Sequence, residues 1–225
     1  MGNMFCFQCE ETAGGKGCAG IAGVCGKSSG AALLFDELTG ALVALARAAG
    51  GNISLPVYKL LAEGLFIAVT NVNFDEAAIR ELSGKVRSEA ARLGNAKEYG
   101  LSELWNADED IRSLKSLLLF GIRGIAAYAH HALVMGYKND EIGLFFIKAL
   151  KAIGDSSYSM NELLPLVMEA GRVNLLCMEL LDKANTETYG IPKPVIVPLL
   201  IEKGPFIIVS GHDLCDLKLL LEQTE

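Results

Sequence analysis

The chain has 225 residues, 51% of them hydrophobic, and a net charge of −7. An apolar fraction this high supports a sizeable buried core, in one large domain or two smaller ones, and it excludes a disordered chain. Lysine and arginine are scattered instead of forming a basic patch, so we expect no nucleic-acid partner and no membrane partner.

Two long apolar stretches, residues 31–50 and 114–135, raise the question of a membrane span. Charged side chains interrupt both of them, among them Asp36, Arg47 and Arg123. We therefore interpret both stretches as buried helices of a bundle. The N-terminus has no basic region followed by an apolar run, which predicts a cytoplasmic protein.

Residues 1–27 are predicted to form a cysteine-rich loop that binds an iron–sulfur cluster. The segment is rich in glycine and alanine and has no sustained helix or strand period, which is typical of a loop wrapped around a ligand. It contains four of the six cysteines, and such crowding in a large chain without a secretion signal indicates metal binding instead of disulfides. These four are Cys6, Cys9, Cys18 and Cys25.

The spacing Cys-x2-Cys-x8-Cys-x6-Cys takes two thiolates from one tight turn and two from a return loop. Four thiolates are the ligand set of a [4Fe–4S] or a [2Fe–2S] cluster, and glycines let the backbone approach the sulfides. Zinc is the alternative, although zinc modules usually present two close pairs and only the first pair is close here. The glycines are Gly14, Gly15, Gly17, Gly20 and Gly23.

Apolar residues at helical spacing predict a mainly helical domain over residues 28–185, built from two three-helix bundles. Beyond it, a connector with two prolines leads to Phe206–Ser210, which reads as a buried strand feeding a helix from about Asp213. A lone strand has no sheet partner, so residues 186–225 are interpreted as a linker and the beginning of an incomplete α/β domain. The expected helices cover about 28–49, 54–70, 74–93, 110–135, 140–153 and 157–183.

Three further positions carry side chains that could take part in chemistry. His212 follows the predicted strand, where α/β folds place ligands, and could either stabilise the turn or bind a metal. Cys177 lies in an apolar helical stripe and is interpreted as a packing residue. Cys215 falls in the first turn of the last helix, where a thiol pKa is lowered.

The segment from Met4 to Ala13, MFCFQCEETA, together with Gly17-Cys18 and residues 23–27, resembles the N-terminus of the hybrid cluster protein (prismane) family of hydroxylamine reductases. The resemblance continues through residues 124–132 and 210–214 and spans essentially the whole chain. It implies two three-helix bundles followed by Rossmann-like domains. It also implies a cubane on the four cysteines and a buried hybrid iron–sulfur–oxygen cluster.

In that family the histidine at the position of His212 is a ligand of the hybrid cluster. The other ligands of that cluster lie beyond the last residue of this sequence, so we expect this chain alone to be inactive. Similar members have five residues in the last cysteine gap, where this chain has six. A related class with a longer middle gap carries [2Fe–2S], whereas the gap of eight favours [4Fe–4S].

The resemblance implies the N-terminal part of a hydroxylamine or nitric oxide reductase. Its first cluster accepts electrons from a redox partner protein and passes them to the hybrid cluster, where hydroxylamine is reduced to ammonia and water. Two alternatives stay open: a stand-alone electron-transfer module without turnover, and a structural zinc module. A homo-oligomer is also left open.

Overall fold

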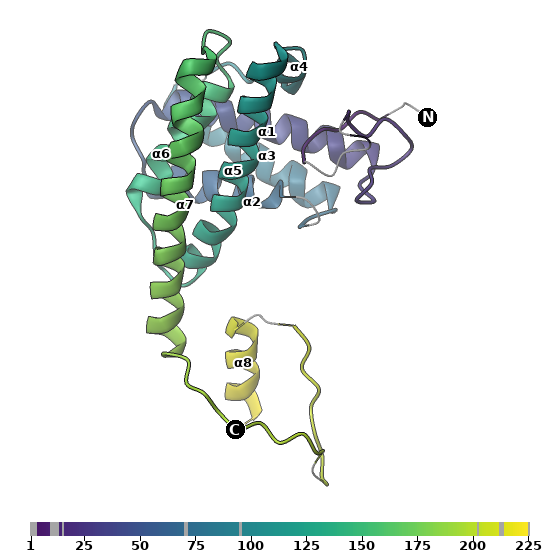
Figure 1. Cartoon of the computed structure of the whole chain (residues 1–225), viewed down its shortest axis with the longest axis vertical. Coiled ribbons are helices and arrows are strands. Elements are labelled where there is room, and N and C mark those ends of the chain that lie inside the picture. Colours follow the sequence, from purple (N-terminus) through teal and green to yellow (C-terminus); the bar gives the residue numbers. More distant parts are fainter. Residues whose placement is uncertain are drawn as a thin grey trace. The chain divides into compact units, whose positions relative to one another are not determined.

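The structure is a computed structural model that describes residues 4–9, 14, 16–69, 72–94, 96–201, 203–211 and 214–224. The chain divides into two units, residues 1–184 and 185–225. The described residues are mainly helical, as predicted, and contain no strand (Figure 1). The helices are α1 Ser29–Ala49, α2 Leu55–Ile67, α3 Glu76–Leu93, α4 Leu101–Trp105, α5 Glu109–Val134, α6 Asp140–Ile153, α7 Met160–Tyr189 and α8 Leu214–Thr224.

Capping side chains decide where the first three helices begin. The Ser28 hydroxyl accepts a hydrogen bond from the Ala31 backbone N–H at 3.0 Å, and Ser54 caps α2 in the same way. Asp75 caps α3 by accepting from two backbone N–H groups. Each cap satisfies N–H groups that have no partner within the helix, and each contributes about 1 kcal/mol. The helices therefore start one or two residues later than the apolar pattern alone predicted.

Two helices differ from the prediction. Residues 94–109 were expected to be a polar connection, but they contain the five-residue α4, which buries Leu101 and Leu104. Five residues are too few to show a helical period in the sequence. The last helix of the first unit, α7, was expected to end at 183 and continues to Tyr189, before Gly190 with a φ of 89°. Positive φ at a residue directly after a helix is the common stop signal.

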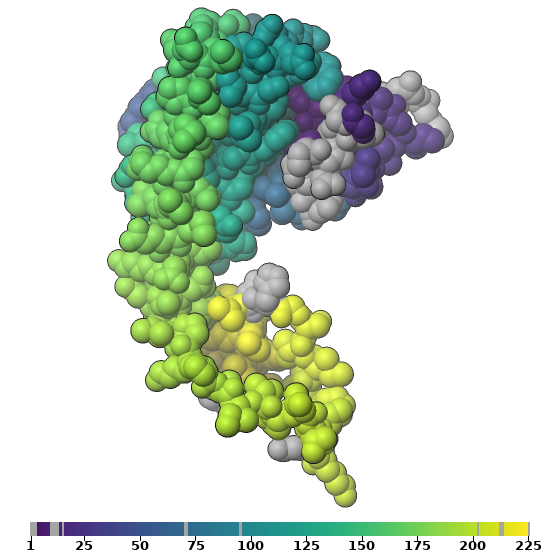
Figure 2. Space-filling view, viewed as in Figure 1, coloured from purple at the N-terminus to yellow at the C-terminus, as the bar shows by residue number. Residues whose placement is uncertain are grey.

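The two three-helix groups, α1–α3 and α5–α7, share one hydrophobic core. Helix α1 packs against α2 and α3 of its own group and against α6 of the other, while α5 packs against α2 and α6. Figures 1 and 2 show α7 lying along α5. The largest fully buried side chains come from both groups and include Tyr58, Phe35, Phe146, Leu38, Leu42, Leu61, Leu118 and Leu119.

Helices α1 and α5 are long and apolar enough, by length and composition alone, to cross a membrane. Within their most apolar windows, however, 72% of α1 and 44% of α5 is buried inside the protein. Their apolar side chains therefore serve the shared core, which is the role that the sequence predicted for them.

The second unit consists of residues 185–225 and includes α8. Most of its described apolar residues are exposed, among them Ile196, Leu199 and Phe206. The strand expected at 206–210 has no partner strand among the described residues, so it stays a prediction. His212 lies outside the described residues.

Candidate metal centre

The first and third cysteines of the N-terminal loop are brought side by side by a backbone bridge. The Cys6 N–H donates to the Cys18 carbonyl at 3.0 Å, and the Cys18 N–H donates to the Cys6 carbonyl at 2.7 Å. Met4 donates to the Gly20 carbonyl at 3.4 Å and extends this pairing. Both cysteines are buried with Met4 and Ala32. The two halves of the loop are therefore tied together at the predicted ligands.

The fourth cysteine lies in a separate tight turn. The Gly23 N–H donates to the Lys27 carbonyl at 2.9 Å, and the Gly26 N–H donates to the Gly23 carbonyl at 2.9 Å. A Cβ atom at residue 23 would lie 3.4 Å from the sulfur of Cys25. Glycine at this position thus leaves room around the thiol, as the sequence predicted for a cluster-binding loop.

Aromatic side chains attach the loop to the helical domain. Phe5 and Phe7 both pack against Trp105 of α4, with ring centroids 4.9 Å and 4.7 Å away. Gly17 has a φ of 99°, and a Cβ atom there would lie 2.7 Å from the Phe5 ring. The short helix that the sequence pattern missed is therefore part of the support for the cysteine loop.

A buried cation lies among the cysteines. Lys27 is 3% exposed, and its ammonium lies 4.2 Å above the centroid of a phenylalanine ring of α1. Burial lowers the pKa of Lys27, and negative charge on Cys6, Cys25 and Cys9 acts in the opposite direction. Burial raises the pKa of the Cys6 thiol, whereas the Gln8 backbone N–H and Lys27 favour its thiolate. Lys27 is thus placed to stabilise thiolate ligands.

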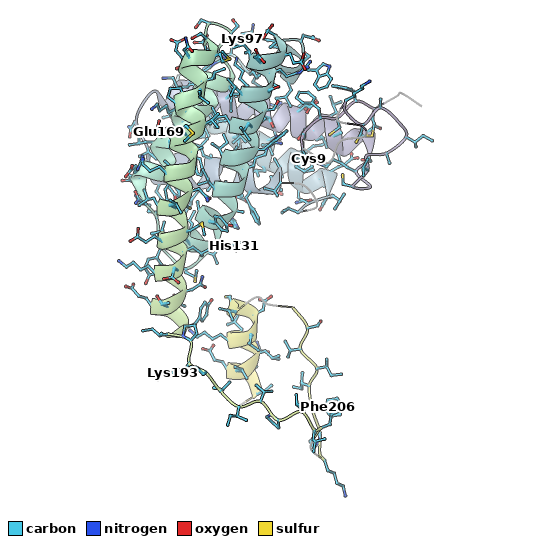
Figure 3. The ribbon with its side chains drawn as sticks, in the orientation of Figure 1. Cys9, Lys97, His131, Glu169, Lys193 and Phe206 are labelled. Carbon is cyan, nitrogen blue, oxygen red and sulfur yellow. The ribbon has the colours of Figure 1, made fainter. Side chains whose placement is uncertain are left out.

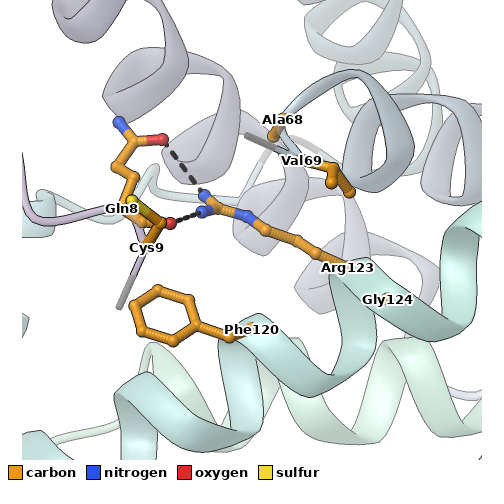
Figure 4. A pocket seen from close by; sticks show the side chains of 7 residues that line it. All are labelled: Gln8, Cys9, Ala68, Val69, Phe120, Arg123 and Gly124. Atoms are coloured by element: carbon orange, nitrogen blue, oxygen red, sulfur yellow. Dashed lines mark hydrogen bonds between the residues drawn. The ribbon is translucent and has the colours of Figure 1, made fainter. Parts of the chain in front are cut away.

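A second buried cation reaches the loop from α5. Arg123 is 3% exposed, and its guanidinium donates to the Gln8 backbone carbonyl at 3.0 Å and to the Gln8 side-chain oxygen at 3.4 Å (Figure 4). It also donates to the Thr39 hydroxyl at 2.9 Å, and the Gln8 amide nitrogen donates to Asp36. These contacts border a cavity of about 190 Å³ lined by Gln8, Cys9, Ala68, Val69, Phe120, Arg123 and Gly124.

In the sequence, Arg123 was evidence only against a membrane span, and no contact between Arg123 and the cysteine loop was predicted. The available signal was a cation within an otherwise apolar helix, which requires a polar or charged partner in the folded protein. The identity of that partner was not predictable, because Gln8 is 115 residues away along the chain.

The four cysteines have features that fit an iron–sulfur cluster. None of them forms a disulfide, and glycine backbone and two buried cations surround them. Within the part of the chain that the structure describes, no group of three or more His, Cys, Asp or Glu side chains gathers closely enough for one metal ion. A single zinc ion needs four ligands at about 2.3 Å from one point, whereas cluster thiolates bind different irons and lie farther apart. Which residues are ligands stays a prediction.

Two histidines of α5 and the two cysteines outside the loop have other environments. His130 is half-buried and stacks on Phe66 with ring centroids 4.7 Å apart, and His131 is exposed. Figure 3 shows His131 well separated from Cys9. Cys177 is fully buried, and burial raises its pKa to about 12, as a packing role requires. Cys215 is exposed.

Comparison with known proteins places the chain in a family. The model of the Prismane/CO dehydrogenase family matches residues 4–225. The chain is 40% identical to a hydroxylamine reductase from Desulfitobacterium hafniense (strain Y51), covering 99% of this chain and 46% of that protein. It is 41% identical to a hydroxylamine reductase from Maridesulfovibrio salexigens, covering 99% of this chain and 46% of that protein. It is 38% identical to a hydroxylamine reductase from Methanocella arvoryzae, covering 99% of this chain and 47% of that protein.

The chain thus spans about half the length of the curated relatives that it matches. The family match covers both units of the structure. The protein belongs to the Prismane/CO dehydrogenase family.

Proposed function

We propose that the N-terminal loop binds a [4Fe–4S] cluster through Cys6, Cys9, Cys18 and Cys25, and that this cluster relays electrons in a hydroxylamine reductase. Membership of the family implies iron–sulfur cluster binding. The observation that carries the assignment is the paired backbone of Cys6 and Cys18 with buried cations beside it. A [2Fe–2S] cluster is the alternative on the same ligands.

Within this proposal the chain's own residues hold the ligands and balance their charge. The bridge between Cys6 and Cys18 orients two thiols, and the turn at Gly23–Lys27 presents a third. Lys27 favours the thiolate form of Cys6, because a nearby positive charge stabilises a negative one. When bound, the cluster supplies one-electron transfer, which the side chains of a protein cannot provide by themselves.

The catalytic step is proposed for the longer protein. Reduction of hydroxylamine to ammonia and water, or of nitric oxide, requires several electrons at a metal with an open position. We propose a hybrid iron–sulfur–oxygen cluster for that step, with His212 as one ligand and the others outside this sequence. The named relatives support it, because they are hydroxylamine reductases about twice as long as the matched region. We also expect a cytoplasmic location and a redox protein as electron donor.

A stand-alone electron-transfer module is the second candidate. It is favoured by the contacts of the cysteine loop with α5 and with its own backbone, which belong to the first unit. This candidate and the reductase proposal both require a cluster on this loop. They differ in that only the reductase proposal includes turnover of hydroxylamine, by the longer protein. A structural zinc module would require neither sulfide nor electron transfer.

The decisive experiment is the measurement of iron, acid-labile sulfide and zinc per chain after purification without oxygen. About four irons and four sulfides would support the [4Fe–4S] proposal, and about two of each would indicate [2Fe–2S]. Cys25→Ser is expected to lower the iron content, whereas Cys215→Ser, which changes an exposed cysteine outside the loop, is expected to keep it. Zinc without sulfide would overturn the proposal.

Turnover is measured by oxidation of a reduced dye in the presence of hydroxylamine. We expect the 225-residue chain to bind a cluster and show no turnover. Substantial turnover by this chain would contradict the assignment of catalysis to a hybrid cluster whose other ligands lie outside it.

A further inference from the structure

Arg123 is a buried cation whose charge is not balanced by an ion pair among the described residues. It comes from the middle of α5 and is 3% exposed. A buried guanidinium loses its hydration, so it persists in a folded protein only where hydrogen bonds and negative charge compensate for that loss. A negative charge close to Arg123 must therefore compensate for the hydration that the guanidinium loses.

The hydrogen bonds of Arg123 go to uncharged oxygen atoms. Its partners in the described part of the chain are the carbonyl and side-chain oxygens of Gln8 and the hydroxyl of Thr39. Asp36 is linked to Arg123 by hydrogen bonds through the Gln8 amide, and it also acts on the guanidinium directly through its charge. The Nε atom of Arg123 is buried and has no hydrogen-bond partner among the residues that the structure describes. These contacts orient the guanidinium without neutralising it.

Asp36 is the largest opposing charge on Arg123, and the cysteine loop adds negative charge to it. Burial lowers the pKa of Arg123 to about 10, while Asp36, Cys6 and Cys9 act in the opposite direction. Cys9 also lines the same cavity as Arg123 (Figure 4). Two predicted ligands therefore lie within the electrostatic range of the buried guanidinium.

The contact with Gln8 also fixes the geometry of the turn between the first two cysteines. A peptide group is planar and trans, so holding its carbonyl oxygen determines the direction of the N–H on its other side. The Gln8 carbonyl shares its peptide with the N–H of Cys9, and the N–H of Gln8 faces the Cys6 thiol. Arg123 thus controls the orientation of the peptide that directly precedes Cys9, in the turn between two predicted ligands.

We propose that Arg123 is the buried counter-charge and positioning residue of the N-terminal cluster, and that it raises the cluster's reduction potential. The inference rests on the proposed cluster at the four cysteines. Reduction adds one negative charge to the cluster, and a fixed positive charge in a poorly solvated site stabilises the reduced form more than the oxidised form. Removing the charge therefore lowers the potential.

The experiment is a redox titration of the cluster-loaded chain, purified without oxygen, with wild type compared with Arg123→Gln. At the wild-type midpoint we expect the ratio of reduced to oxidised cluster to fall about tenfold in the variant, which corresponds to about 59 mV for one electron. Arg123→Lys keeps the charge and is expected to recover most of the loss, since only the paired hydrogen bonds to Gln8 are weakened.

Lys115→Gln is the matched control. Lys115 is also a buried cation on α5, 2% exposed, but its ammonium donates to the Asp155 carbonyl at 2.7 Å and not to the cysteine loop. Its removal should lower the stability of the fold while leaving the potential unchanged. A potential that falls equally in both variants, or in neither, overturns the inference.

Cluster content separates failure of this inference from failure of the proposed function. Wild-type protein without a cluster contradicts the proposed function, whereas clusters of equal potential in wild type and Arg123→Gln contradict only the role of Arg123. If Arg123→Gln holds no cluster, Arg123→Lys decides the matter. A cluster in Arg123→Lys would support the proposed role of Arg123 as counter-charge. Loss of the cluster in Arg123→Lys as well would overturn that role.

Discussion

Gly17 offers the sharpest test of the cysteine loop, because its backbone and its surroundings both exclude a side chain. Its φ is 99°, and a Cβ atom would lie 2.7 Å from the Phe5 ring. In the left-handed region a residue other than glycine costs about 1–2 kcal/mol. The overlap also displaces Phe5 from Trp105, and an aromatic pair contributes about 0.5–1.5 kcal/mol. Gly17→Ala should therefore destabilise the closed loop by about 2–3 kcal/mol.

Two other glycines of the loop serve as matched controls. Gly26 has a φ of 85° but open space around its Cα, so Gly26→Ala should cost only the backbone strain of about 1–2 kcal/mol. Gly20 lies outside the left-handed region, and the closest described atom to an added Cβ is 3.8 Å away. Gly20→Ala should be almost neutral. The expected order of destabilisation is Gly17, then Gly26, then Gly20.

The assay is the rate of iron loss to a chelator from cluster-loaded protein without oxygen. If release requires the loop to open, 2–3 kcal/mol in Gly17→Ala corresponds to a rate about 30 to 150 times that of wild type. Gly26→Ala should lie between Gly17→Ala and wild type. Equal release rates for Gly17→Ala and Gly20→Ala would refute the reasoning, since the close approach of Phe5 would then have no energetic consequence.

Two further predictions concern the stability of the fold, measured by denaturant unfolding of the metal-free chain. Burial raises the pKa of Asp36 from 3.8 to about 6, so the stability gained from its protonation is present below pH 4 and is lost as the pH rises through 6. Asp36→Asn should abolish this loss of about 3 kcal/mol, and an unchanged pH profile would contradict the assignment. Gly40→Ala should destabilise by at least about 1–3 kcal/mol because the new Cβ would meet the Tyr99 carbonyl oxygen. Gly84→Ala, on an open helix surface, should instead stabilise by about 0.5–1 kcal/mol, and similar effects of both changes would contradict the packing described here.

The long helices were predictable from the sequence because apolar periodicity is a local property. α1 and α6 end at the predicted residues, Ala49 and Ile153, and the N-cap Ser28 accounts for the start of α1 one residue later than predicted. Helix α4 could not be predicted, because five residues show no period and its burial depends on packing against distant segments. The end of α7 was also misplaced, since the sequence near 185 has no stop before Gly190.

For the candidate site, the sequence predicted the ligand types, which stay a prediction, and nothing of the side chains around them. The spacing of the cysteines indicated the cluster loop, and free thiols in that loop agree with it. The two buried cations beside it were not predicted, although Arg123 is visible in the sequence as an isolated charge within an apolar stretch. The roles of Lys27 and Arg123 depend on the folded structure. There Arg123 donates a hydrogen bond to Gln8, which is 115 residues away in the sequence.

The bond between Arg123 and Gln8 has a consequence for the order of events during synthesis. The N-terminal loop leaves the ribosome first, but the guanidinium that fixes its first turn belongs to a helix made much later. Contacts between residues far apart in sequence form late, because a long segment of chain must first be ordered. The cysteines are therefore exposed to solvent, oxygen and competing metals until α5 has folded against α2. For the proposed cluster, insertion is best timed after the helical domain has closed, so the bundle would serve as the assembly platform for a site that precedes it in sequence.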